Sequence, residues 1–273
     1  MFSNIWKGAL IGIANVIPGV SGGTLALILG IYEKLTEAIG EFFDCTHKKR
    51  MEYLVFLSQI AVGVIGGILL FSKLIKYFFE NYYEGTSFFF LGLIVASLPA
   101  VIHHRKKISP NRKESVLFLM GGVVPLAFFF YNVHYGNTMQ AMIAGDMTMS
   151  YMTKLVICGA LAGGAMIVPG VSGSLLLILL GEYANIIGFV SELRIVPIAM
   201  VGIGAVLGIV LFAKIMDKLL KKYHDETLYF VLGIITFSLI EVWPGITIAG
   251  FNIVRDIVAF GAGLILVKGI RSR

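Results

Sequence analysis

The stretch IPGVSGG at residues 17–23 returns in the second half of the chain as VPGVSGS at residues 168–174. Each copy lies inside a long apolar segment, where a Pro-Gly break frees backbone N–H and C=O groups. A bilayer offers these groups no partner, so a broken helix is tolerated only where it is buried in protein or lines a polar cavity. Two matching breaks in the two halves of a membrane protein point to a substrate site.

The composition excludes an ordinary soluble domain. Of the 273 residues, 58% are hydrophobic and only 14% are charged, and the mean hydropathy is +0.89. The charged residues cluster between apolar runs such as 54–70, 87–102 and 195–212. We therefore expect an all-α polytopic membrane protein. The two cysteines, Cys45 and Cys158, lack metal-ligand spacing, so no metal site is expected.

The similarity between the halves extends beyond the motif. LGIY at 29–32 matches LGEY at 180–183, which lies 151 residues later, and LGLI at 91–94 matches LGII at 232–235, which lies 141 residues later. We interpret the ten-residue difference as an extra loop at 44–53 in the first half. The chain is therefore expected to consist of two repeats, 1–145 and 146–273.

Each repeat is expected to contain a re-entrant helical hairpin broken at the motif, followed by about three transmembrane helices. The first hairpin has pieces at 5–16 and 22–40, and the second piece carries too many charges to cross a bilayer. Repeat 1 is assigned a hairpin at 5–40 and spans at 54–78, 87–102 and 115–132. Repeat 2 is assigned a hairpin at 154–190 and spans at 195–220, 227–243 and 250–268.

The positions of Lys and Arg predict the orientation. With both termini in the cytoplasm, the basic clusters at 48–50, 105–107 and 221–222 all face inward, as the positive-inside rule requires. Three crossings per repeat is an odd number, so the second repeat is expected to be inverted relative to the first. The cations that fall outside are Lys73, Lys76, Lys154, Arg194 and Arg255, the last of which is expected to pair with Asp256.

The residues of the motif suit a break in a helix. Pro18 and Pro169 lack an N–H group and clash with the preceding helical turn. Gly19 and Gly170 can adopt the positive φ that lets the chain reverse. Alternatively, the motifs only shape two hairpin tips, and their glycines only allow close helix packing.

The residues after each break suit a bound anion. Ser21 and Ser172 are favoured N-caps for the helix that follows. The N-terminus of such a helix carries partial positive charge and exposed N–H groups, which bind phosphate or carboxylate. The candidate phosphate-binding residues are Ser21, Gly22, Gly23, Thr24, Ser172, Gly173 and Ser174.

Twin PGVSGG-type motifs in a small two-repeat membrane protein resemble the bacterial polyprenyl-phosphate (undecaprenyl-phosphate) transporters. The resemblance covers essentially the whole chain, although Ser174 replaces the last glycine of the second motif. It implies a flippase that returns this lipid carrier from the outer to the inner leaflet of the bacterial plasma membrane for the synthesis of peptidoglycan and other envelope glycans. The family pattern falls on Pro18, Gly19, Ser21, Gly22, Gly23, Pro169, Gly170, Ser172 and Gly173.

Charged residues at membrane depth are further candidates. Glu33 and Glu182 could bind a coupling ion, H⁺ or Na⁺, or could simply lie at the interface. Lys73 and Lys214 occupy equivalent positions of the two repeats and could meet a lipid phosphate or extend to the nearest interface. Arg194 could attract an anionic headgroup.

Two other functions are considered. A small-anion permease would use the same helix ends, whereas an enzyme acting on lipid phosphates would need an acid or base group that is not apparent. No nucleophile with a nearby His and no Walker motif is found, so no cofactor and no enzymatic activity are expected. The expected partner is the polyprenyl-phosphate lipid rather than a nucleic acid. The sequence leaves a homodimer open.

Overall fold

The computed structural model describes residues 2–16, 21–103, 111–135, 148–244 and 253–271, and within them it contains helices and no strand. This confirms the expected all-α architecture. The helices of the first half are α1 (Phe2–Val16), α2 (Gly22–Ile28), α3 (Tyr32–Gly40), α4 (His47–Asn81), α5 (Tyr83–His103) and α6 (Arg112–Tyr135). Those of the second half are α7 (Met149–Ile167), α8 (Gly173–Leu179), α9 (Tyr183–Ser191), α10 (Ile195–Lys222), α11 (His224–Val242) and α12 (Ile253–Arg271).

Among the described residues, four helices are long and apolar enough to cross a membrane, namely α4, α6, α7 and α10. The apolar part of α5, Tyr83–Pro99, is slightly shorter. The helices α11 and α12 have acidic residues in their first turns. The chain is thus a polytopic membrane protein.

The helices pair in the same way in the two halves. Helix α1 packs along α4, and α7 packs along α10. Glycines bring the paired backbones close together, since a Cβ on Gly63 would lie 2.0 Å from the Ile5 carbonyl oxygen, and a Cβ on Gly208 would lie 1.9 Å from that of Ala160. Small residues at such contacts are the usual basis of close helix packing in membranes.

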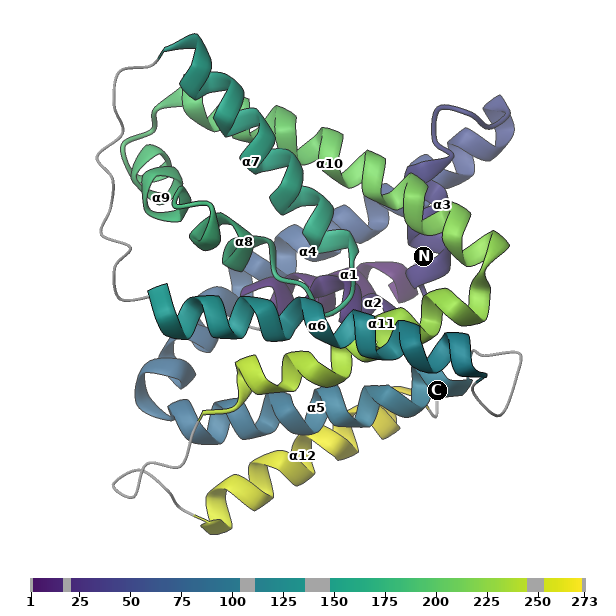
Figure 1. The fold of residues 1–273 in the computed structure, drawn as a ribbon, viewed down its shortest axis with the longest axis vertical. Coiled ribbons are helices and arrows are strands. Elements are labelled where there is room, and N and C mark those ends of the chain that lie inside the picture. The colour runs from purple at the N-terminus through teal and green to yellow at the C-terminus, as the bar shows by residue number, and fades with distance from the viewer. Residues whose placement is uncertain (1, 17–20, 104–110, 136–147, 245–252, 272–273) are drawn as a thin grey trace.

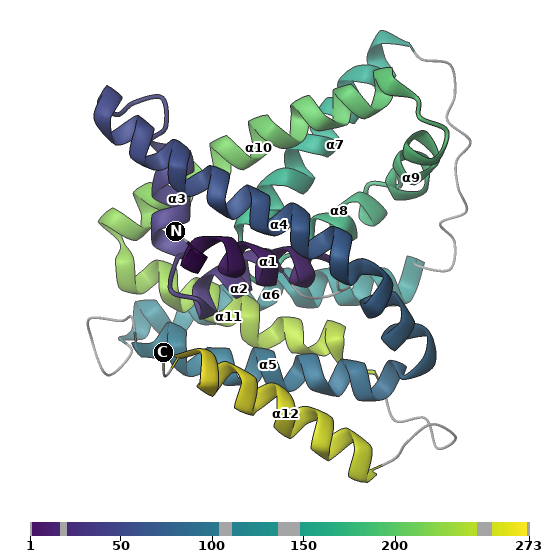
Figure 2. The same cartoon turned by 180° about the vertical axis from the view of Figure 1, so that it is seen from behind.

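The last helix of each half packs on the other half. Helix α5 packs along α12, and α6 packs along α11, and these four helices lie next to one another in both views (Figures 1 and 2). The contacts are again equivalent, because Gly92 faces the Phe260 carbonyl and Gly233 faces the Phe118 carbonyl. The two halves are therefore interlocked.

Helices α4 and α10 run in opposite directions. The Glu41 carboxylate accepts hydrogen bonds from Lys49, at the start of α4, and from Lys221, at the end of α10. Figures 1 and 2 show the same antiparallel course. We call this end of the molecule the Glu41 side, and the opposite end, where α4 turns into α5 at Tyr82, the Tyr82 side.

The segments that follow the motifs are more broken than predicted. Residues 22–40 form the two short helices α2 and α3, not one helix, because the chain turns at Gly30 with φ +65°. The second hairpin turns in the same way at Gly181, with φ +72°. These values favour glycine. The prediction was wrong because the apolar residues on both sides of each glycine conceal the turn.

The extra loop predicted at 44–53 is also wrong in part. Residues 47–53 form the first two turns of α4, which therefore has 35 residues where α10 has 28. From these turns Lys49 binds Glu37, and Arg50 binds the Phe42 carbonyl oxygen. The added length thus supports the first hairpin.

Candidate functional site

The two motif tips lie in contact. The Gly170 N–H donates to the Thr24 hydroxyl over 2.9 Å. The Ser21 hydroxyl donates to the Val168 carbonyl over 3.5 Å, and the Tyr32 hydroxyl donates to the Ile167 carbonyl over 3.0 Å. These carbonyls end α7, where no further helical turn can use them. Side chains of the first hairpin therefore satisfy the backbone at the break of the second.

The break in the second hairpin has the expected form. Helix α7 ends at Ile167, Pro169 is buried, and Gly170 has φ +81°. A Cβ on Gly170 would lie 2.8 Å from Cγ2 of Ile234, so both the backbone angle and the space require glycine. Pro18 and Gly19 lie outside the described residues.

The first tip is closed. Ser21 is 4% exposed, Thr24 is 3% exposed, and every residue of α2 is buried. The Gly22 N–H donates to Oδ1 of Asn15, and the Gly23 N–H donates to the Ser21 hydroxyl, both over 3.2 Å. The predicted N-cap at Ser21 is thus confirmed. Two N–H groups that were expected to meet an anion are already bonded within the protein.

The second tip is more open. Ser172 occupies the N-cap position, but its side chain does not bond to the backbone of α8, so this part of the N-cap prediction was wrong. Its hydroxyl lies 2.8 Å from that of Ser174, which is exposed. Gly173 packs against α7, where a Cβ would lie 2.6 Å from the Ala162 carbonyl oxygen. Two hydroxyls therefore lie together at an accessible helix start.

Glu182 lies at the centre of a buried polar cluster. Its side chain is 3% exposed. It accepts hydrogen bonds from Lys154, from the Tyr151 hydroxyl over 2.8 Å and from Nδ2 of Asn185 over 2.9 Å. Because Tyr151 and Lys154 come from α7 and Asn185 from α9, the cluster fastens α9 to α7. This arrangement supports a positioning role for Glu182.

The other charged candidates are dispersed. Glu33 is paired with Nε2 of His224 over 3.2 Å, and Lys214 is paired with Asp44. Arg194 occupies the N-cap position of α10 without a side-chain capping bond and lies over the Phe189 ring, 5.1 Å from its centre. Lys73 belongs to α4, and its side chain lies outside the described residues. The structure therefore does not gather these residues at the motif tips.

Sequence reasoning missed two residues that hold the tips. Asn15 bonds to the start of α2, and Tyr32 bonds to the end of α7. Asn15 carried a signal, because it is a polar residue within an apolar segment just before the break. Tyr32 recurs as Tyr183 in the repeat, but the sequence did not reveal its partner, which lies 135 residues away.

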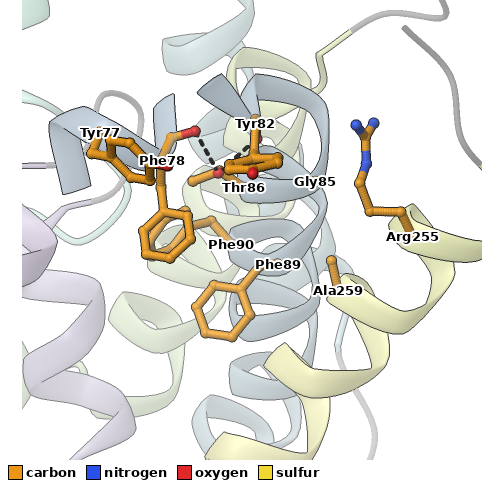
Figure 3. Close-up of a pocket in the computed structure, with 9 residues that line it drawn as sticks. All are labelled: Tyr77, Phe78, Tyr82, Gly85, Thr86, Phe89, Phe90, Arg255 and Ala259. Carbon is orange, nitrogen blue, oxygen red and sulfur yellow. Dashed lines mark hydrogen bonds between the residues drawn. The ribbon is translucent and has the colours of Figure 1, made fainter. Parts of the chain in front are cut away.

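A pocket of about 630 Å³ lies at the Tyr82 side. Its walls are aromatic and apolar, with one cation, and come from α4, α5 and α12. They are formed by Tyr77, Phe78, Tyr82, Gly85, Thr86, Phe89, Phe90, Arg255 and Ala259. Figure 3 shows Tyr77, Phe78 and Tyr82 across the pocket from Arg255 and Ala259. Such walls suit an apolar chain.

The cation of the pocket is already paired. Nε of Arg255 donates to Asp256 over 2.7 Å, which confirms the predicted local pair, and its Nη2 lies 3.5 Å from a Glu84 oxygen. Two carboxylates therefore oppose the single positive charge of Arg255, which does not favour an anion in the pocket. In the described part of the chain, no group of three or more His, Cys, Asp or Glu side chains is placed to hold a metal ion.

Residues 11–255 match the family described as undecaprenyl phosphate translocase-like. The chain belongs to this family. Within the translocase-like family it is 32% identical over 252 residues to a polyprenyl-phosphate transporter of Vibrio cholerae serotype O1, covering 89% of this chain and 77% of the relative. It is 30% identical over 253 residues to a polyprenyl-phosphate transporter of Staphylococcus aureus, covering 89% and 86%. No solved structure gives a significant match.

Proposed function

We propose that this chain is a transporter that moves polyprenyl phosphate between the two leaflets of the membrane. The observation that carries the proposal is the contact between the two motif tips, from Thr24 to Gly170, in a chain of the translocase-like family. The relatives named polyprenyl-phosphate transporters support the same substrate class. The protein acts as a carrier, with no chemical step on the lipid.

In this proposal the phosphate meets the two tips in turn. The hydroxyls of Ser172 and Ser174 can exchange their mutual hydrogen bond for bonds to phosphate oxygens, and the start of α8 adds partial positive charge. When the tips separate, the first tip is released to bind from the other side. Its contributors are Ser21, Gly22, Gly23 and Thr24. The site stays in place while the access to it alternates.

We assign the Glu41 side to the cytoplasm. The basic stretches 48–50, 112–113 and 218–222 lie at this side, and Lys and Arg are retained on the cytoplasmic face. Both termini are then cytoplasmic, and the repeats have inverted topology. The transporter returns undecaprenyl phosphate from the outer to the inner leaflet of the bacterial plasma membrane, where envelope glycan synthesis uses it.

The pocket at the Tyr82 side then faces the outer leaflet. Its aromatic walls suit part of the prenyl chain, because burial of apolar surface is favourable and the branched chain has no polar group to satisfy. Arg255 holds α12 to Glu84 on α5, so it shapes the pocket. The phosphate itself binds elsewhere, at the tips.

The experiment is inward movement of labelled polyprenyl phosphate in proteoliposomes. The double variant Ser172→Ala, Ser174→Ala is expected to slow this movement, while Ser58→Ala, an exposed serine on α4 that bonds to its own helix, is the control. An undiminished rate in the double variant would overturn the proposed site. Uptake of inorganic phosphate or sulfate without movement of the lipid would instead favour the small-anion permease.

A further inference from the structure

Three pairs, each between an acidic side chain and a Lys or His side chain, join the first hairpin to the second half of the chain on the Glu41 side. Glu33, in α3, is paired with Nε2 of His224 over 3.2 Å. Glu41, directly after α3, is paired with Lys221 over 2.6 Å. Asp44, in the turn before α4, is paired with Lys214. The partners are 170 to 191 residues apart in the sequence, so these pairs connect the two halves.

The backbone contact beneath the pairs is close. Helix α3 packs on α10, and a Cβ on Gly40 would lie 2.8 Å from Cα of Lys214. On its other face α3 is held by α4, where Lys49 and the Tyr53 hydroxyl both bond to Glu37. The first hairpin is therefore held between the start of α4 and the end of α10.

The second hairpin lacks this support. Among the described residues, α9 makes no comparable contact with α4, although α4 is the equivalent of α10. The end of α9 is instead open, since Glu192, Leu193 and Arg194 are all exposed. The two hairpins therefore occupy different states within one structure.

The repeat offsets identify what the second hairpin would contact. Gly40 corresponds to Ser191 and Glu41 corresponds to Glu192, whereas Lys214 corresponds to Lys73. The other latch positions lose their charge or reverse it, because Glu33 corresponds to Ala184 and Lys221 to Glu80. Docking of α9 on α4 would thus place Ser191 at Lys73 and Glu192 opposite Glu80, with no equivalent of the three pairs.

We infer that the pairs Glu33–His224, Glu41–Lys221 and Asp44–Lys214 form a cytoplasmic latch, which holds the first hairpin on α10 and sets the resting state with that side closed. Opening of the latch allows α9 to dock on α4, with Ser191 at Lys73. The inference rests on the proposed function, which assigns the latch to the cytoplasmic side and gives it a role in the transport cycle. Half-exposed pairs are weak singly, about two- to fivefold each in an equilibrium, so the latch can open during each cycle.

The test is the labelling of a buried residue under the latch. Ala38, in α3, is fully buried, so Ala38→Cys reacts with a maleimide only when the hairpin leaves α10. The background carries Cys45→Ser and Cys158→Ala. Lys214→Glu is expected to speed labelling by more than about fivefold, because it turns an attraction to Asp44 into a repulsion. Adding Asp44→Lys restores the slow rate, because it re-forms the pair with reversed charges.

Lys218→Glu, one turn further along α10, makes the same change of charge and is expected to leave the rate within twofold. Equal acceleration by Lys214→Glu and Lys218→Glu, or failure of the Asp44→Lys exchange to restore the rate, would overturn the latch. Labelling is measured in membranes without added substrate. A protein that moves no polyprenyl phosphate but shows this labelling pattern would refute the proposed function and leave the latch intact.

A second measurement follows the opposite side. Cross-linking of Ser191→Cys to Lys73→Cys is expected to rise when Lys214→Glu is present, since α9 then docks on α4 more often. Lys214→Glu could speed the labelling of Ala38→Cys while this cross-link stays constant. That result would refute the inference that α9 docks on α4 when α3 leaves α10.

Discussion

In the first hairpin Ser21 and Thr24 are almost fully buried, whereas in the second Ser172 is half-buried and Ser174 is exposed. The motifs themselves are nearly the same, so their residues do not cause this difference. It comes from the neighbours, because α2 packs on α5 and α7, whereas α8 packs on α7 and α6 and makes no comparable contact with α11 among the described residues. The helices packed around each tip, rather than the motif residues, therefore decide whether a motif is a closed contact or an accessible site.

The largest expected effect tests the packing of the tips. A Cβ on Gly173 would meet the backbone oxygen of Ala162, whereas a Cβ on Gly22 would meet the Asn15 side chain, which can move. We expect Gly173→Val to displace α8, at about 1–3 kcal/mol of overpacking, and to lower transport more than tenfold. Gly22→Val is the matched variant and should do less. Transport rates and thermal unfolding in detergent measure both, and the reverse order would break the comparison.

The second prediction concerns the bond between the tips. Thr24→Val removes the acceptor of the buried Gly170 N–H, which should cost about 1–3 kcal/mol of stability. Thr36→Val is the control, because the Thr36 hydroxyl bonds only to carbonyls of its own helix. Denaturation midpoints of the two variants give the difference. Equal midpoints would show that the tip contact contributes little to the fold.

The third prediction separates stability from transport. Ser21→Ala loses a formed N-cap and should cost about 0.5–2 kcal/mol of stability. Ser172→Ala loses no such cap, so its stability should stay near that of the wild type while transport falls. Unfolding and transport are measured on the same two preparations. A stability loss at Ser172 equal to that at Ser21 would contradict the difference between the tips.

The fourth prediction compares the two ends of the molecule. Gly85, in the pocket at the Tyr82 side, corresponds to Glu226 at the Glu41 side. Ala259 corresponds to Leu117, because the next residues, Phe260 and Phe118, face the equivalent glycines Gly92 and Gly233. Ala259→Leu should fill the pocket and slow transport of a long-chain lipid severalfold, with little effect on a lipid with a short prenyl chain. Equal slowing of both lipids would argue against a chain in this pocket.

The smallest expected effect is that of pH on the latch. Hydrogen bonds from Lys221 and Lys49 lower the pKa of the Glu41 carboxyl below its usual value of about 4.3. A lowered pKa stabilises the closed latch at neutral pH, and this contribution is lost only as the pH falls through the lowered value. The distance between spin labels attached at Phe43→Cys and Lys218→Cys should therefore stay constant from pH 8 to about pH 5. A change in that distance between pH 8 and pH 6 would contradict the assignment of the response to Glu41.

The sequence predicted the parts of this fold that depend on local chemistry or on repetition. Pro169 and Gly170 break the chain as expected, Ser21 caps α2, and the two motif copies meet. The turns at Gly30 and Gly181 were missed, because a glycine between apolar residues is compatible with a continuous helix. The latch was beyond sequence reasoning, because Lys214 and Asp44 are brought together only by the packing of α3 on α10.

The last helix of each half, α6 or α12, packs on the other half, and this packing has a consequence for biosynthesis. Helix α5 packs on α12 and α6 packs on α11. Neither α5 nor α6 can therefore contact its partner until the ribosome has made nearly the whole chain. A membrane insertase must therefore hold α5 and α6 in place while about half the protein is still to come. A chain released after residue 145 would leave the glycine faces of both helices, at Gly92 and Gly121, against lipid instead of Phe260 and Phe230. Membrane quality control can recognise these exposed faces as the sign of an unfinished molecule.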